Sequence, residues 1–507
     1  MTILAPGTSV SISAVTATNA IPSDLGTFFC AGTASSGPVS VPVLVRNLND
    51  YIGTFGNRDD TTTSMTLYDA IDTFFQEGGR LAYVSRVYGQ AGITADTASH
   101  TFADQSGPPG ANTIVVHANG PGAFGNNVTV SIAVNTSNGS FTITLVCPGY
   151  PTETSPALFT PQDAVNWATN ESDLVSLSLS AGNTSIPPTN NPAATTTPVH
   201  LAGGANNSVA IASTDWQAAL NAFISDLGMG QVAFPGQGGS GMATYYTMLL
   251  NHAQQFNRFA LLDCAATQTT ASAIEADALS ATSAALDPSY GFMVAPYVLY
   301  PGLPTSTQTP PFLRSVPASG PVAGLMSRIA GLGANGDTAA AGQNGLLVHA
   351  TDVADYFLDS DRAALDAAGV GVVRNYRGQV QLYGYTTLST DPNWQDVGNS
   401  RLRMQIIDGV RSIGDQFVFA DLDAQGHTLS AFGGMISSYL TALWQQSALY
   451  GLHPADAFFV NVGDSINTPV TATNRELLAE IAVRMSPTAE YVIISVTKYP
   501  VSIPLPS

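Results

Sequence analysis

The stretch QVAFPGQGGSGMATYYTMLLNHAQQFNRFALLDC, from Gln231 to Cys264, contains the pattern that decides the fold class. Its first five residues, QVAFP, are a short apolar run that predicts a buried strand, and RFALLDC at its end predicts a second one. The segment between them, MATYYTMLLNHAQQF, predicts a helix. A strand, a helix and a second strand in this order predict a βαβ unit with parallel strands.

A glycine pattern, Gly236-x-Gly238-x-x-Gly241, joins the first strand to the helix. In dinucleotide-binding proteins, a loop with this spacing lets a pyrophosphate approach the N-terminus of the helix. Here Pro235 directly precedes the first glycine and no second nucleotide-binding half is evident, and the pattern alone is weak evidence. Two interpretations therefore stay open: an NAD(P)-binding oxidoreductase, and a strand-to-helix loop in a scaffold without a cofactor.

The alternation of strands and helices continues on both sides of this unit. LGTFFCAG, VPVLV and RLAYVSRV predict strands before it, and YGFMVAPYV and GVGVVRNY predict strands after it. Helical segments such as TLYDAIDTFFQEGG lie between them, and we expect Gly78 and Gly79 to end that helix. The pattern predicts an α/β domain with a mostly parallel sheet covered by helices.

Between residues 101 and 200 the composition changes to Thr, Ser, Asn, Gly and Pro. NNVTVSIAV and GSFTITLVC alternate between apolar and polar residues, and Asn138-Gly139 between them is typical of a hairpin turn. AGNTSIPPTNNPAATTTPVH, which follows, is predicted to be an exposed loop. No basic residue occurs between Arg86 and Arg258. We predict a small β domain, inserted into the α/β domain and facing solvent on the outer surface.

The chain after Arg377 is predicted to form an α+β domain. HTLSAFGGMISSYLTALWQQ has apolar residues at steps of three and four, which predicts a helix capped by Thr428 or Ser430. In residues 477–485, apolar side chains alternate with other residues, which predicts a strand. Thr473 and Glu476 have the spacing of a helix capping box, but the alternation is the longer signal and we follow it.

Both ends of the chain contain short alternating segments that predict strands outside any domain. Their apolar positions are Val10 and Ile12 near the N-terminus, and Val492, Ile494 and Val496 near the C-terminus. An isolated strand leaves its backbone donors and acceptors unpaired, so it is a template for pairing with another chain. These arms either add to the sheets of neighbouring copies by β-augmentation or fold back onto their own domain.

Composition excludes several classes of function. The chain has 507 residues, 45% of them hydrophobic and 10% charged, which predicts a folded protein with several domains. Its net charge of −20 disfavours binding to nucleic acid and to anionic membrane surfaces. No stretch approaches the ~20 apolar residues of a membrane span, and the N-terminus has no basic region typical of a signal peptide. We expect synthesis and folding in a cytoplasm.

Residue types that perform catalysis or bind metals do not occur at productive spacings. Cys30, Cys147 and Cys264 form no CxxC pair, and the histidines show no HExxH motif, so that His252 is predicted to be a packed or solvated residue. DLDAQG resembles the start of a calcium loop, but Phe432 stands at its twelfth position. We predict no catalytic residue, no metal and no cofactor, and therefore that the protein is not an enzyme.

An ordered set of segments across nearly the whole chain resembles contractile tail sheath proteins of bacteriophages and related contractile injection systems. The segments are APGTSVSISAV, PVSVPVLVRNLNDYIGTFG, LYDAIDTFFQEGGRLAYVSRV, PGAFGNNVTVSI, HLAGGANN, GQVQLYGYTTL, RLRMQIIDGVRSIG, LWQQSALYGLHPADAFFV and INTPV.

The resemblance implies a virion structural protein that polymerises as a helical homo-oligomer around an inner tail tube protein. Such a sheath also meets baseplate and tail terminator proteins, and it contracts to drive the tube through a target cell envelope. No nucleic acid binding, no membrane insertion and no enzymatic step is implied. The implied location is a virion tail or an injection particle, assembled in the bacterial cytoplasm.

The resemblance also implies the domain organisation. It consists of an N-terminal linking arm at 1–22, a subtilisin-like α/β sheath domain at 23–100 and 201–377, the inserted β domain at 101–200, a tube-proximal α+β domain at 378–490 and a C-terminal linking arm at 491–507. Arg401, Arg403 and Arg411 are candidate tube or neighbour contacts. Relatives often have an arginine where this chain has Tyr385, and an adjacent basic pair where it has Arg401-Leu402-Arg403.

A third interpretation, a surface-layer protein or adhesin, would need a secretion route that this N-terminus does not display.

Overall fold

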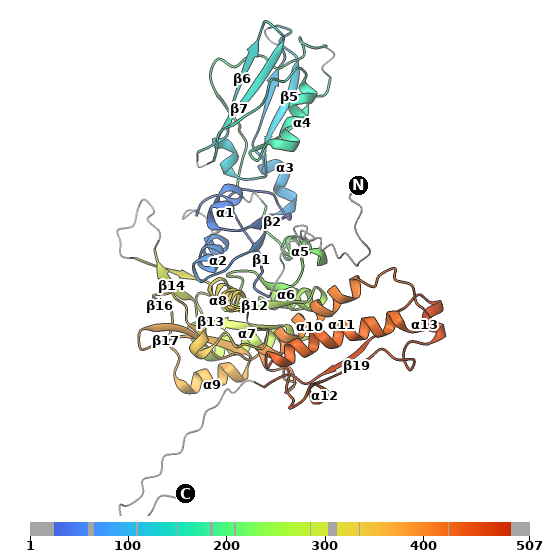
Figure 1. The fold of residues 1–507 in the computed structure, drawn as a ribbon. Coiled ribbons are helices and arrows are strands. Elements are labelled where there is room, and N and C mark those ends of the chain that lie inside the picture. The colour runs from blue at the N-terminus through green and yellow to red at the C-terminus, as the bar shows by residue number, and fades with distance from the viewer. Residues whose placement is uncertain are drawn as a thin grey trace, which may run out of the picture.

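The computed structural model describes residues 25–58, 65–107, 110–148, 150–182, 186–206, 209–283, 285–302, 312–333, 335–423 and 425–487. The predicted arm positions Val10, Ile12, Val492, Ile494 and Val496 lie outside these residues. The buried apolar side chains form three clusters. In Figure 1 the corresponding parts are a β-rich part at the top, a large α/β part in the middle and a helical C-terminal part at the lower right.

The α/β part contains an eight-stranded sheet with the order β18-β17-β13-β12-β11-β1-β3-β2. The strands are β1 (Phe28–Gly32), β2 (Pro42–Val45), β3 (Ala82–Arg86), β11 (Gly230–Ala233), β12 (Arg258–Asp263), β13 (Gly291–Ala295), β17 (Val370–Tyr376) and β18 (Gln379–Tyr383). The six inner strands run parallel, and the edge strands β2 and β18 are antiparallel to their neighbours. Strands β1, β3, β11, β12 and β13 are buried along their whole length, as expected for a sheet covered on both faces. The predicted mostly parallel sheet is confirmed.

Helices flank this sheet, and a small antiparallel sheet lies beside it (Figure 1). The helices are α1 (Leu48–Phe55), α2 (Met65–Gln76), α5 (Ser213–Asn221), α6 (Ala243–Gln255), α7 (Ala271–Thr282), α8 (Ser319–Gly331) and α9 (Asp359–Ala367), and the small sheet contains β14 (Val298–Pro301), β15 (Leu313–Val316) and β16 (Asp352–Val353). Gly78 has a φ of +101° and follows α2, and the amide of Gly79 donates to the carbonyl of Phe74 at 2.8 Å. This is the helix end that the two glycines predict.

The inserted part has two antiparallel sheets with the orders β10-β6-β7-β8 and β4-β5-β9. Its elements are α3 (Ile93–Asp96), β4 (Ser99–Ala103), β5 (Asn112–Ala118), β6 (Thr129–Asn135), β7 (Ser140–Val146), β8 (Glu153–Thr154), α4 (Pro161–Glu171), β9 (Val175–Leu179) and β10 (Val199–His200). The predicted hairpin is confirmed, since β6 pairs with β7 and Gly139 in its turn has a φ of +72°. A hydrophobic cluster of its own, built between Ala98 and Leu201, fills this part.

The prediction of an exposed loop over residues 181–200 is wrong at two positions, Asn191 and Pro192, which are buried. Asn191 is 0% exposed, and its amide group donates to the carbonyls of Gly139 and Phe159, both at 3.0 Å. The amide side chain therefore fixes this connection against the β6–β7 turn. A polar loop sequence does not show this role, because the partners are distant in the chain.

The C-terminal part packs two long helices, α10 (Val397–Asp415) and α11 (His427–Gln445), against a two-stranded sheet of β19 (Phe458–Asn461) and β20 (Glu480–Val483). The short helices α12 (Pro454–Ala457) and α13 (Pro469–Thr473) complete it. Strand β20 confirms the strand that the alternation in residues 477–485 predicts. Thr473 is the last residue of α13 and does not cap a following helix. None of the helices in the described part of the chain combines the length and apolarity that a membrane span needs.

The predicted cap of α11 is wrong. The helix begins at His427, one residue before Thr428, and its N-cap is Gly426 in the left-handed conformation. The carboxylate of Asp423 accepts from the amides of His427 and Thr428 at 3.0 and 3.1 Å instead. An acceptor three residues before the cap thus satisfies the first amides of the helix.

Candidate functional site

The glycine loop connects β11 to α6, as predicted, but its donors are used inside the protein. The amide of Gly236 donates to the Asp263 carboxylate at 3.0 Å, and the amide of Gly239 donates to the Tyr246 hydroxyl at 2.8 Å. That hydroxyl in turn donates to the carbonyl of Asp263 at 3.0 Å. The loop is therefore tied to the carboxyl end of β12, where a bound pyrophosphate would need those amides.

Gly238 allows close packing of backbone against backbone, whereas Gly236 and Gly241 have positive φ values of +75° and +87°. A Cβ atom added at Gly238 would lie 2.2 Å from the carbonyl oxygen of Asp263 and 2.4 Å from that of Cys264. No side chain fits there, which explains the glycine without a nucleotide. The negative carboxylate of Asp263 also stands where a phosphate would have to approach. The oxidoreductase interpretation is not supported, and the loop is a packing element of the scaffold.

Asp263 is the most constrained side chain at this end of the sheet. It is 2% exposed and accepts from the amide of Ser319 at 2.8 Å, from the hydroxyl of Ser319 at 2.6 Å and from Gly236. It thereby joins β12, the glycine loop and the start of α8. Burial raises the pKa of Asp263 to about 6, although the hydrogen bonds from Ser319 and Gly236 act in the opposite direction. The sequence showed the carboxylate at the strand end but not these partners.

Asp263 is expected to make stability depend on pH. Its folded pKa of about 6 lies above the ~3.9 of an unfolded aspartate, so its contribution is fully present below about pH 4 and is lost as the pH rises through about 6. The loss amounts to as much as ~3 kcal/mol. In urea unfolding at pH 4 and pH 7.5, the free-energy difference between wild type and Asp263→Asn should shift by this amount in favour of the variant. A pH-independent difference would show that Asp263 titrates normally.

The structure separates the three predicted contact arginines. Arg401 is 1% exposed, and its guanidinium donates to the Tyr385 hydroxyl at 3.2 Å and to the Leu25 carbonyl at 3.4 Å. It has no surface to offer another chain here, so we keep the contact prediction only for Arg403 and Arg411. Tyr385 stands where relatives often have an arginine. Here its hydroxyl accepts a hydrogen bond from the buried Arg401 guanidinium.

Arg403 and Arg411 lie on α10 and line one groove. Arg403 is partly exposed, donates to the Ser289 hydroxyl at 2.8 Å and stacks over the ring of Trp394, 4.2 Å from its centroid. Arg411 is exposed. The groove has a volume of about 930 Å³ and runs between α10 and β20. A third arginine, Arg484, also lines the groove, and no carboxylate is among its described lining residues. The apolar lining residues are Ile406, Ile407, Val410, Ile481, Val483 and Met485.

Strand β20 has one edge at this groove that no described strand pairs with. The amide of Arg484 donates to the carbonyl of Ala457 at 2.8 Å, on the side of β19. Because antiparallel pairing alternates, the backbone groups of Ile481 and Val483 point to the opposite side. No hydrogen bond from those two amides is found within the described part of the chain. A strand edge without a partner, beside an apolar floor, is a place where a further strand can add.

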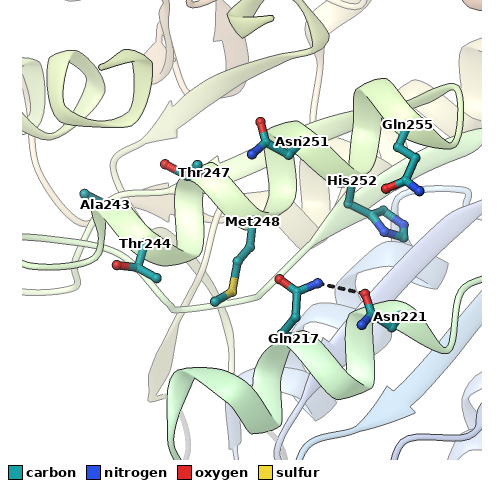
Figure 2. A pocket seen from close by; sticks show the side chains of 9 residues that line it. All are labelled: Gln217, Asn221, Ala243, Thr244, Thr247, Met248, Asn251, His252 and Gln255. Atoms are coloured by element: carbon teal, nitrogen blue, oxygen red, sulfur yellow. Dashed lines mark hydrogen bonds between the residues drawn. The ribbon is translucent and has the colours of Figure 1, made fainter. Parts of the chain in front are cut away.

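A second hollow, of about 460 Å³, lies between α5 and α6 (Figure 2). Its walls are mainly carboxamide and hydroxyl side chains, and Gln217 donates to Asn221 across one turn of α5 at 2.8 Å. His252 also lines it, but its Nε2 lies 2.7 Å from Nη1 of Arg258, and burial lowers the pKa of His252 to about 3. Of the two predicted states, packed or solvated, the structure shows a packed histidine that is 4% exposed. Its lowered pKa makes the ring a weak base near neutral pH.

The residue types that bind metals are scattered in the part of the chain that the structure describes. In this part, no group of three or more His, Cys, Asp or Glu side chains is arranged to hold a metal ion. Cys30, Cys147 and Cys264 are all buried free thiols. Burial raises the pKa of each thiol, which disfavours the reactive thiolate.

Comparison with protein-family models and with curated protein sequences finds no match. Solved structures do match. A sheath tail protein from Listeria innocua superposes with a TM-score of 0.58 and 15% identity, covering 88% of this chain and 90% of that one. The contracted sheath of PVC, an extracellular contractile injection system, gives 0.55 and 14%, covering 98% of both chains.

The contracted helical sheath of the anti-feeding prophage gives a TM-score of 0.54 and 17% identity, covering 97% of this chain and 98% of that one. The likeness therefore extends over nearly the whole chain, including the inserted and C-terminal parts. At sequence identities of 14–17%, this structural likeness shows the fold alone. The chain has the fold of contractile-tail sheath proteins.

Proposed function

We propose that the protein is the structural subunit of a contractile tail sheath, which polymerises helically around an inner tube and contracts to drive the tube through a target cell envelope. The observation that carries this proposal is the fold likeness to sheaths over 97–98% of the chain. A shared enzyme scaffold would match over the α/β part alone, whereas here the whole arrangement matches. The closed glycine loop agrees with a scaffold role.

The groove beside β20 supplies the joint between copies in this proposal. A two-stranded sheet is marginally stable alone, and β20 has an unused edge over an apolar floor. We propose that the C-terminal arm of a neighbouring copy adds there as a third strand. Its alternating apolar side chains, Val492, Ile494 and Val496, would then face Ile407 and Val410 on α10.

The remaining placements extend the same proposal. The C-terminal part, with Arg403 and Arg411, lies nearest the inner tube, and the inserted β part faces outward and is tolerant of change. Baseplate and terminator proteins meet the two ends of the polymer. Contraction draws on many contacts that change together, so that ~1–3 kcal/mol per subunit sums to a large amount of work over a long sheath.

Negative-stain electron microscopy of the full chain, expressed alone and purified gently, tests the function. We expect hollow tubes with a cogwheel cross-section, because contraction-state contacts need only copies of this chain. If only monomers form, coexpression with the inner tube protein should produce tubes. Monomers under both conditions would contradict a sheath role.

A further inference from the structure

The β17–β18 hairpin has one face that is buried at Val372 but exposed toward the hairpin turn, at Tyr376. In its register Tyr383 lies opposite Val372 and Gln381 opposite Arg374. Since side chains alternate along a strand, Arg374, Tyr376, Gln381 and Tyr383 share one face, while Val380 and Leu382 on the other face are buried. Tyr376 is 45% exposed and Tyr383 48%. Figure 1 shows β17 at the margin of the molecule, above α9.

Arg374 is held in place on this face but has no hydrogen-bond partner among the described residues. Its guanidinium lies 3.5 Å from the ring centroid of Tyr383 and 4.8 Å from that of Tyr376. Its Nε is buried and unpaired. By contrast, the nearby Arg362 pairs with Asp359 and donates to the Phe357 carbonyl at 2.9 Å. Stacking thus fixes the plane of the Arg374 guanidinium, and its terminal Nη groups, unlike the buried Nε, remain as donors for another molecule.

The surroundings of Arg374 are typical of a protein interface. It lines a hollow of about 360 Å³ together with Tyr356, which is 68% exposed and donates to Asp352 at 2.7 Å. Leu358, two residues after Tyr356 in the chain, is 72% exposed. Tyrosine and arginine are enriched at interface centres: tyrosine buries much area with only two side-chain torsions to fix, and arginine offers a planar set of donors.

Charge indicates the partner. The chain has 36 acidic and 16 basic residues, so two copies repel unless a base stands at their contact. A planar guanidinium with free donors fits a carboxylate, and another copy of this chain supplies many. We propose that the outer face of the β17–β18 hairpin is an interface with a second copy, in which Arg374 binds a carboxylate of that copy. The inference rests on the proposed function, which brings copies side by side.

Sedimentation velocity of the full chain over a range of concentrations and salt tests this interface. Arg374→Glu should weaken self-association at least ~10-fold, and Arg374→Lys should fall between it and wild type, because it keeps the charge but loses the planar fork. Arg46→Glu is the matched control. It makes the same charge change at an exposed arginine elsewhere and should stay within about twofold of wild type. Tyr356, Tyr376 and Tyr383 should become protected from iodination on association.

Each outcome decides the inference. Association of Arg374→Glu equal to wild type, or a wild-type chain that stays monomeric under all conditions, would overturn it. Tubes that form without Arg374 would leave the sheath function standing and remove this interface. Arg374-dependent association that never yields tubes would support the interface while the sheath function fails. Should Arg374→Glu misfold in a thermal melt, Tyr376→Ala replaces it and should also weaken association.

Discussion

A chain that ends at Glu490, without Tyr491 to Ser507, is expected to remain folded and to form no tubes. The reason is that the described residues already contain three hydrophobic clusters, so the arm is not needed to close any of them. What the deletion removes is the strand proposed to add to β20 of the next copy. Copies that lose a backbone-paired strand lose a whole row of hydrogen bonds, which no surface contact replaces.

Electron microscopy and thermal melting together check this result. A matched pair of variants uses the two-residue period of a strand: replacing Val492, Ile494 and Val496 by Thr should block assembly, whereas Ile493→Thr, on the opposite face, should preserve it. Tubes of normal length from the truncated chain would refute the linking role. If the arm instead folds back on its own copy, truncation would lower the melting temperature, and that result would favour the other interpretation of the arm.

Replacing Glu77 by Ala is expected to destabilise the monomer by ~3–5 kcal/mol, the cost of removing one partner from a buried charged network. Glu77 is 0% exposed at the end of α2. Its carboxylate accepts from the Tyr300 hydroxyl at 2.9 Å, from the amides of Val348 and His349 at 2.7 and 2.9 Å, and from Arg328 at 3.3 Å. The substitution leaves the Tyr300 hydroxyl and the amides of Val348 and His349 without their acceptor, whereas Arg328 still donates to the backbone carbonyl of residue 77.

Urea unfolding at neutral pH measures the effect, and Tyr300→Phe is its control. Phe removes one hydroxyl and keeps the ring, so only ~1 kcal/mol should be lost. A Glu77→Ala variant as stable as Tyr300→Phe would mean that water or a shifted side chain satisfies the donors. The large loss would identify Glu77 as the link between α2, β14 and the segment before β16.

The elements of the α/β part could be predicted from the sequence because their signals are local. LGTFFCAG and RFALLDC are apolar runs, and they become β1 and β12, buried along their whole length. Asn138-Gly139 predicts its hairpin since a tight turn depends on two residues. The alternation in residues 477–485 correctly indicated β20, against the capping-box spacing. An ordered set of such segments was also enough to indicate the sheath resemblance, which the structural comparisons support.

The sequence by itself thus determined most elements of the α/β part and the acidic, arginine-based charge, but YGFMVAPYV, predicted as one strand, forms β13 and β14 in two different sheets. Tertiary structure alone decided how the polar side chains are used, because their partners are distant in the chain. From sequence alone, the glycine loop was compatible with phosphate binding. In the structure, its amides donate to the Asp263 carboxylate and the Tyr246 hydroxyl instead. Arg401 and Arg374 are equally basic in sequence, yet burial and hydrogen bonds commit the first to the interior, and two tyrosine rings hold the second at the surface.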